Sequence, residues 1–222
     1  MGLASFYFVR KNMKNKQFVF EFQNYIFWGL NRKSREHCFV LSIKCKKAFR
    51  HCILKAYPDM QFRTMKGLGK VSTSSKMNAK KQIVDYLSQE LHDYFAQNIT
   101  KQFDDWHKDV CDKISEIFKT NTGIELPFGK AQKLVNISFK YAYCLNDADK
   151  YLSKFYPCHM ALDSIVLKWY AKNKIGTVCV NNWSSIKYSD YIRIQTDIRE
   201  YCDKQKTFPL IKEFDVWLEN MD

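Results

Sequence analysis

The feature that most constrains the fold is the spacing of apolar residues along the second two-thirds of the chain. In residues 78–98, and again in 101–120, apolar side chains recur every three or four positions, the spacing that places them on one face of a helix. Gly123 after the second stretch is typical of a helix C-terminus, and Pro209 suits the first turn of a final helix. Further stretches of this kind run at about 129–145, 158–172, 186–203 and 208–219. The sequence therefore predicts a mainly α-helical, multi-helix globular domain.

The N-terminal third carries one more helical pattern, preceded by a segment that alternates. Residues 34–57 have a capping residue, Ser34, and a stop at Pro58, and between them apolar and basic residues separate onto opposite faces. The apolar face holds Cys38, Leu41, Cys45, Ala48, Phe49, Cys52 and Ala56. The alternating phenylalanines from Phe6 to Phe22 favour a small β-hairpin, although the apolar residues that follow them would extend a helix equally well.

Charge is distributed very unevenly along the chain. Residues 1–81 hold 18 Lys and Arg against three acids, a net +15, whereas the whole chain of 222 residues carries +13. Residues 82–125 hold four basic and nine acidic side chains, a net −5. A polyanion that releases its own counterions on contact would relieve the repulsion within such a one-sided block. The partner we expect is therefore nucleic acid, DNA or RNA. The alternative is an acidic protein surface, to which a regulator or inhibitor would dock its basic face.

The candidate contacts to phosphates are mostly lysines. The chain has 29 Lys and seven Arg, which favours point-charge contact with phosphates over reading of base edges, so we expect little sequence specificity. These candidates lie on the outer face of the 34–57 helix and in the loop after it: Lys44, Lys46, Lys47, Arg50, Lys55, Arg63, Lys66 and Lys70. Trp183 stands in a polar stretch of Asn and Ser, where it could stack on a base or anchor a partner protein. The composition of an AT-rich genome explains abundant Lys, but not the scarcity of acids in the first third.

Residues 58–76 have the composition of a mobile surface loop. Glycines and serines alternate with lysines, and the run GLGK at 67–70 lacks the spacing and the Lys-Ser/Thr ending of a nucleoside triphosphatase. A Gly-Lys loop can wrap a phosphodiester through its N–H groups and lysine charge, although a solvated linker has the same composition. We place a boundary here, between a basic N-terminal region at 1–75 and a helical core domain at 76–222.

Clusters of cysteines and acids raise the question of a metal site. On one helix Cys38, Cys45 and Cys52 would be spaced by about 10.5 Å along the axis, too far for their thiolates to share a zinc ion. Five acids in the 101–120 stretch could hold magnesium, but a solvated face or a counterface for basic side chains is more typical. These acids are Asp104, Asp105, Asp109, Asp112 and Glu116. We expect no metal and no cofactor.

One stretch has an enzyme-like pattern. The segment PFGKAQK at 127–133 leads into a helical pattern, and PCHMALD follows at 157–163. This arrangement resembles the helix-hairpin-helix DNA glycosylases, in which a glycine-bearing hairpin leads into a helix with a nucleophilic Lys, and a catalytic Asp follows a proline-containing turn. The resemblance implies that Lys133 or Lys130 attacks the sugar C1′ of a flipped nucleotide and that Asp163 assists. The alternative is that both lysines lie on a solvated helix start and that the aspartate pairs with the histidine one turn before it. Binding without catalysis is the function we expect first.

The chain shows no sign of a membrane location. No stretch of about 20 residues is apolar throughout, and no leading cationic segment indicates a signal peptide. Eight cysteines at irregular positions are typical of reduced, buried thiols. We therefore expect a cytosolic protein with no membrane contact.

Overall fold

The computed structural model describes residues 42–60, 65–96, 101–145 and 147–219, and within them the chain forms helices and no β-strand. This confirms the mainly α-helical prediction, while the predicted hairpin lies outside the described residues. The helices are α4 (Lys46–Ala56), α5 (Thr73–Phe95), α6 (Phe103–Thr122), α7 (Phe128–Tyr143), α8 (Leu152–Phe155), α9 (Ser164–Lys172), α10 (Tyr188–Lys204) and α11 (Pro209–Leu218). The short 3-10 turns are η1 (Tyr57–Met60), η3 (Leu68–Lys70), η4 (Ala148–Tyr151) and η5 (Trp183–Ser185).

Helix α4 begins later than the predicted helix because a turn precedes it. The N–H of Cys45 donates to the carbonyl of Ser42 at 2.8 Å, and the backbone of Cys45 is extended. The carboxylate of Asp147 accepts hydrogen bonds from the N–H of Ile43, at 2.8 Å, and from the Ser42 hydroxyl. Since these groups are held by a distant aspartate, the helix starts only at Lys46. The prediction of an uninterrupted helix through Cys45 is wrong.

The faces of α4 follow the predicted division. The helix ends at Ala56, before Pro58, and its inward residues are buried. They are Ala48, Phe49, Cys52, Ile53 and Ala56. Cys45, which we predicted to be buried with them, is half-buried at the turn, and Cys38 lies outside the described residues. The inner face of α4 packs against α5 and α7.

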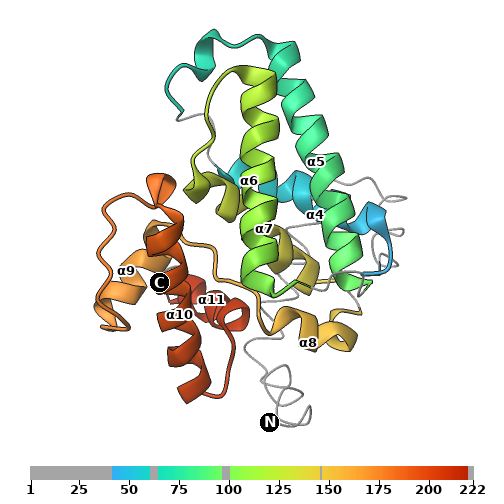
Figure 1. The fold of residues 1–222 in the computed structure, drawn as a ribbon. Coiled ribbons are helices and arrows are strands. Elements are labelled where there is room, and N and C mark those ends of the chain that lie inside the picture. Colours follow the sequence, from blue (N-terminus) through green and yellow to red (C-terminus); the bar gives the residue numbers. More distant parts are fainter. Residues whose placement is uncertain (1–41, 61–64, 97–100, 146, 220–222) are drawn as a thin grey trace.

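Helices α5 and α6 form a long packed pair with recognisable ends. The side-chain oxygen of Ser72 accepts a hydrogen bond from the N–H of Ser75 at 3.1 Å and so caps the start of α5. Gly123 ends α6 with a φ of 70°, a backbone conformation that favours glycine, as the sequence predicted. In Figure 1 these helices run alongside each other, while α9, α10 and α11 gather at the other side of the molecule.

The sequence predicted a helix from 158, but residues 158–163 are not helical. Helix α9 begins at Ser164, because the side chain of Asp163 accepts hydrogen bonds from the first N–H groups of that helix. Helix α11 begins at Pro209, in agreement with the prediction. Two clusters of buried apolar side chains fill the interior, one around α4 to α8 and α11 and one around α9 and α10, and Phe128 packs against both. No helix in the described segments has the length and apolar character that crossing a membrane requires.

Candidate functional site

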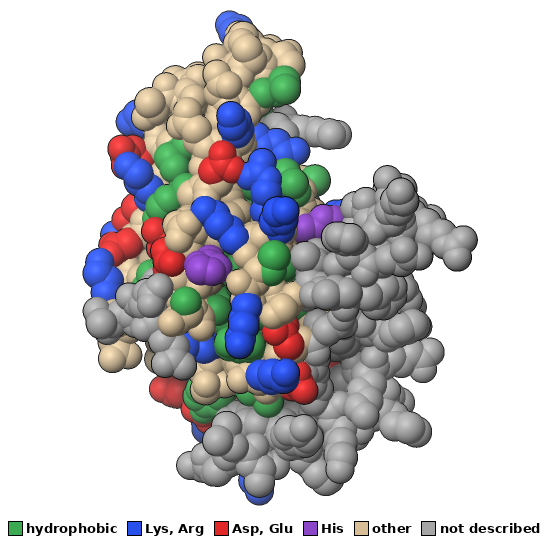
Figure 2. Space-filling view, turned by 90° about the vertical axis from the view of Figure 1, so that its right-hand side faces the viewer, with side chains coloured by type: hydrophobic (Ala, Val, Ile, Leu, Met, Phe, Trp, Pro, Cys, Tyr) green, Lys and Arg blue, Asp and Glu red, His purple; other side chains and the backbone are tan. Residues whose placement is uncertain are grey.

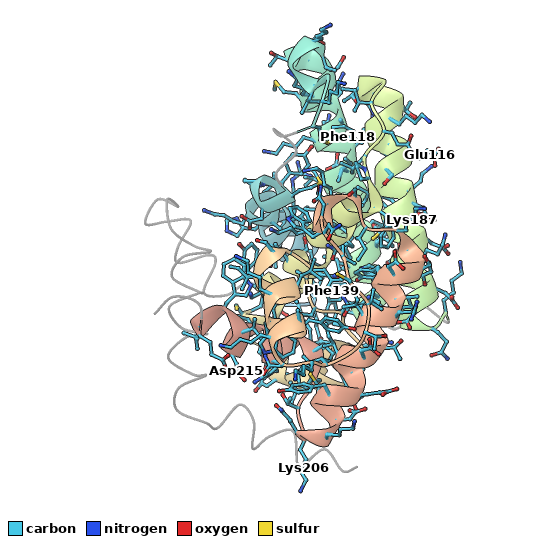
Figure 3. All side chains as sticks on the ribbon, turned by 90° about the vertical axis from the view of Figure 1, so that its left-hand side faces the viewer. Glu116, Phe118, Phe139, Lys187, Lys206 and Asp215 are labelled. Carbon is cyan, nitrogen blue, oxygen red and sulfur yellow. The ribbon has the colours of Figure 1, made fainter. Side chains whose placement is uncertain are left out.

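Helix α7 is buried along its length although it carries charged residues. Every residue from Gly129 to Tyr143 is buried, and three of them are lysines: Lys130, Lys133 and Lys140. Phe139, on the same helix, is labelled in Figure 3 amid the side chains between the helices. Burial of an unpaired ammonium group is costly, so buried lysines are expected to have charged or hydrogen-bonding partners. The partners of these lysines define the candidate site.

Lys133 lies opposite Asp163. Nζ of Lys133 is 3.4 Å from Oδ2 of Asp163, and each side chain keeps only 6% of its surface exposed. Oδ1 of Asp163 accepts hydrogen bonds from the N–H groups of Ile165 at 2.9 Å and Val166 at 3.1 Å. The alternative of a solvated Lys133 and an Asp163–His159 pair is wrong, because α7 is internal and His159 bonds to other residues.

Trp183 covers the two lysines at the start of α7. Its ring centroid lies 4.6 Å from Nζ of Lys133 and 5.4 Å from Nζ of Lys130, within the range of cation–π contacts. Oδ1 of Asn182 accepts a hydrogen bond from the N–H of Ser184 at 3.0 Å and so shapes the turn that carries the ring. The tryptophan that the sequence placed in a polar loop is thus half-buried over two lysines.

Gly129 allows this turn to lie close to α7. A Cβ atom on Gly129 would stand 2.0 Å from the carbonyl oxygen of Trp183, so a larger residue would push the turn away.

Nζ of Lys130 donates to the carbonyl of Met60 at 3.4 Å. Burial, and then the nearby charge of Lys133, lower the pKa of Lys130. The site therefore joins α7 and η5 to the end of η1, whose buried Met60 lies within the stretch 58–76 that the sequence predicted to be a surface loop.

Residues 158–163, which we call the inner segment, run through the interior between α8 and α9. Buried backbone groups without helical partners must find others, and here long amide side chains supply them. Oε1 of Gln195 accepts from the N–H of Met160 at 3.1 Å, and its Nε2 donates to the carbonyl of Met160 at 2.7 Å. Gln132 binds the N–H and carbonyl of Leu162 in the same way. Side chains from α7 and α10 thus hold the segment in place.

A second buried ion pair lies further along α7. Nζ of Lys140 is 3.0 Å from Oε1 of Glu213, and the two side chains are 4% and 2% exposed. Oε2 of Glu213 accepts a hydrogen bond from the N–H of Ala161 at 2.7 Å. Burial raises the pKa of Glu213, against the opposing effect of Lys140. This pair ties α7 to α11 and to the inner segment.

A chain of polar side chains joins α6 and α10 to the inner segment. Nε2 of His159 lies 2.9 Å from Oδ1 of Asp104, and Nδ1 lies 2.8 Å from the hydroxyl of Tyr191. That hydroxyl is 3.3 Å from Nε2 of His107. Burial lowers the pKa of His159 to about 4 and the pKa of His107 well below its usual value. Although burial pushes the other way, hydrogen bonds from Arg199 and His159 hold the pKa of Asp104 below its usual range.

Four acids of α6 lie in ion pairs with basic side chains: Asp104, Asp109, Asp112 and Glu116. Three of these pairs are Lys101 with Asp109 at 2.5 Å, Lys108 with Asp112 at 2.6 Å, and Lys113 with Glu116 at 2.9 Å. In the part of the chain that the structure describes, no group of three or more His, Cys, Asp and Glu side chains could hold a metal ion. The lysines of these three pairs lie on α6 itself or directly before it, and the carboxylates stay largely exposed, so this face of α6 is a solvated face.

The candidate phosphate contacts lie on the outside of the molecule. Lys44, Lys46, Lys47, Lys66 and Lys70 are exposed. Arg50 and Lys55 are half-buried, and Arg50 pairs with Asp85 of α5. Arg63 lies outside the described residues. Figure 2 shows Lys and Arg side chains along this side of the molecule, with acidic side chains between some of them.

Comparisons of the chain with protein-family models, curated proteins and solved structures find no match. Within the site, the sequence did not single out Gln132, Gln195 or Glu213. In the sequence these residues stand out only as polar residues at inward positions of apolar stretches. On α7 this pattern is weak, because every face of the helix is buried and no face is distinguished as inward. The structure brings together Lys130, Lys133, Asp163 and Trp183, although the sequence assigned Trp183 to a separate role in stacking or anchoring.

Proposed function

We propose that the protein binds nucleic acid through phosphate contacts made by its N-terminal basic region. The observation that carries this proposal is the environment of the lysines among residues 42–60 and 65–81. These residues include ten Lys and Arg, none of them buried, and the single acid Asp59. Asp59 bonds to the hydroxyl of Tyr141 at 2.9 Å, and burial raises its pKa. Five of the candidate contacts are exposed and able to meet a polyanion.

The proposed binding has little sequence specificity. Exposed lysines give charge without the planar fork that reads guanine edges, and Arg50 already pairs with Asp85. Gel-shift titrations against single- and double-stranded DNA and RNA of unrelated sequence test this. Affinity is expected to differ little between sequences, and log affinity is expected to fall against log salt with a slope of magnitude ~4 or more.

A triple variant locates the contact surface. Replacement of Lys44, Lys47 and Lys66 by Ala is expected to flatten the salt slope by up to ~3 units, because each lysine would neutralise one phosphate. The matched control replaces three exposed lysines elsewhere: Lys119, Lys204 and Lys206. If the two triple variants had equal effects, binding would depend on the total charge of the protein and the proposed contact surface would be wrong. Failure to bind any nucleic acid would favour the alternative of an acidic protein partner.

The Lys133–Asp163 pair favours a second candidate function, a glycosylase/lyase-like reaction on the bound nucleic acid. In such a reaction the amine forms a bond to the sugar C1′ as the bond to the base breaks, or it condenses with the aldehyde of an abasic site and releases water. Oδ2 of Asp163, 3.4 Å from Nζ of Lys133, is placed to take a proton from the ammonium. The convergence of two residues 30 positions apart in the sequence supports this candidate.

Borohydride trapping tests the second candidate. DNA with an abasic site or a damaged base is expected to form a covalent adduct with the protein in borohydride, and Lys133→Gln is expected to abolish it. Lys168→Gln, an exposed lysine on α9, is the control and is expected to leave the adduct unchanged. Absence of an adduct across several lesions would leave nucleic-acid binding without catalysis.

A further inference from the structure

Gln132 makes a two-point contact with the backbone of the inner segment. Its Nε2 donates to the carbonyl of Leu162 at 2.8 Å, and its Oε1 accepts from the N–H of Leu162 at 3.2 Å. The same side chain is fixed at its own helix, because Nε2 also donates to the carbonyl of Gly129 at 2.8 Å. Nδ2 of Asn136, one turn further along α7, donates to Oε1 at 3.0 Å. Gln132 is completely buried.

The contact between Gln132 and Leu162 lies directly beside the Lys133–Asp163 ion pair. Gln132 directly precedes Lys133, and Leu162 directly precedes Asp163. Two hydrogen bonds between one side-chain amide and the backbone N–H and carbonyl of one residue, Leu162, fix both the separation of the two segments and their register. The next residue on each segment then carries the charged group, and these groups meet at 3.4 Å.

We propose that Gln132 is a positioning residue that holds Asp163 opposite Lys133. The value of this arrangement for catalysis rests on the second candidate function, whereas the positioning itself does not. Glutamine is suited to the task because its amide offers a donor and an acceptor side by side. Methionine, of similar length, has no donor and only a weak acceptor in its thioether sulfur.

The structure supplies a matched control in Gln195. This residue makes the same pair of hydrogen bonds to Met160, at 3.1 and 2.7 Å, and like Gln132 it is completely buried. Its backbone partner is three residues from Asp163 rather than next to it. Replacing Gln195 by Met therefore removes a similar buried contact from the same segment without releasing the residue that precedes the aspartate.

The experiment compares Gln132→Met and Gln195→Met with the unchanged chain. Reductive methylation with formaldehyde and cyanoborohydride, mapped residue by residue by mass spectrometry, reports the accessibility and pairing of each lysine, with Lys140 as internal reference. Both variants are expected to lower the unfolding temperature, but only Gln132→Met is expected to speed methylation of Lys133 relative to Lys140. In borohydride trapping, Gln132→Met is expected to lose ~10-fold or more of the adduct rate, because small displacements in a site cost this much.

A third variant, Gln132→Glu, covers the case in which Gln132→Met does not fold. An ionised glutamate lacks the donor, whereas a protonated one offers both a donor and an acceptor, and burial favours the protonated form. Methylation of Lys133, relative to the unchanged chain at each pH, is expected to return to normal as pH falls. A role in stability alone predicts no such recovery at one lysine.

The outcomes separate the two proposals. Equal acceleration at Lys133 in Gln132→Met and Gln195→Met, or a Gln132→Glu rate that stays accelerated down to the lowest pH at which the protein is folded, would overturn the positioning role. Selective acceleration in Gln132→Met supports it, because methylation requires no nucleic acid. If the unchanged protein then forms no adduct on any lesion, the second candidate function fails and the positioning of the ion pair stands.

Discussion

Lysines occur in two opposite environments in this protein, the surface around α4 and the interior around α7. Lys44 and Lys47 are exposed, with their charge in solvent. Lys133 and Lys140 are 6% and 4% exposed in their side chains, and each lies within 3.4 Å of a carboxylate on another segment. A surface lysine costs folding almost nothing and remains available to a partner, whereas a buried one must be matched by a specific acid.

The burial of these lysines needs an explanation other than stability alone. A buried ion pair is weak evidence for stability, because apolar residues of similar volume often stabilise a fold as well or better. The Lys133–Asp163 pair holds an amine and a carboxylate next to each other, and the ring of Trp183 lies over the amine. The two environments match the two proposals made above, in which the surface lysines contact a polyanion and the buried amine of Lys133 reacts.

The largest expected effect comes from breaking the second buried pair. Glu213→Leu leaves the Lys140 ammonium without this carboxylate and removes the acceptor of the Ala161 N–H. Loss of one partner of a buried pair typically costs about 3–5 kcal/mol, which urea unfolding measures. The double variant with Lys140→Met is expected to recover most of the loss. A single variant that loses less than ~1 kcal/mol would show that the pair is not held as the structure has it.

Phe49→Ala tests the inner face of the helix whose outer face carries the surface lysines. The Phe49 ring is fully buried and stacks on Phe95 with ring centroids 5.3 Å apart. Truncation of such a side chain costs about 3–5 kcal/mol. Lys47→Ala, two residues before Phe49 and on the exposed face, is the control and should change stability by less than ~0.5 kcal/mol. Similar losses for both would contradict the division of α4 into a core face and a solvent face.

The sequence predicted most helices because their ends depend on local signals. Gly123 and Pro209 act within one turn of the helices they bound, and the apolar spacing of α5 and α6 is visible in single windows. The inner segment failed as a predicted helix because its backbone groups are held by Gln132 and Gln195, far away in sequence. The predicted start of the first helix was wrong for the same reason, because the distant carboxylate of Asp147 holds the backbone just before α4.

The candidate site was predictable only in part. The motif around Lys133 and Asp163 suggested that the two residues act together, and the structure places them together. Their burial was not visible, because lysines at the start of a helix are usually solvated and no local pattern marks a helix covered on every side. Trp183 was recognised as unusual in its polar loop, but its neighbours on α7 are 50 or more positions away in the sequence.

Stability is expected to fall on mild acidification. Burial lowers the pKa of His159 to about 4 from a usual 6.5. The unfolded chain therefore binds a proton that the folded chain does not, and stability present above pH 6.5 is lost as pH falls toward 4. Between pH 6.5 and 4.5 this group should account for about 2 kcal/mol. His107, also with a lowered pKa, adds in the same direction, and Glu213, with a raised pKa, opposes it.

The comparison of unchanged protein with His159→Gln isolates the contribution of this imidazole. Urea unfolding at several pH values should give a shallower decline for the variant, since Gln does not titrate. Asp104, whose pKa is lowered, contributes at more acidic pH than this range. Parallel declines in the two proteins would show that His159 is not held neutral in the fold.

Trp183→Ala should have the smallest effect on stability. It should also reduce the difference in methylation rate between the buried and the surface lysines. Trp183 is half-buried, and its contacts with ammonium groups are worth about 1–2 kcal/mol at most. Without the ring, Lys130 and Lys133 are expected to react with formaldehyde and cyanoborohydride at rates closer to those of Lys44, while Lys140, covered by other residues, stays slow. Trp183→Phe keeps a ring over the amines and should stay near the unchanged rates. If the Ala variant left both lysines as slow as Lys140, Trp183 would not be their cover, and a substrate would have to reach Lys133 from another side of α7.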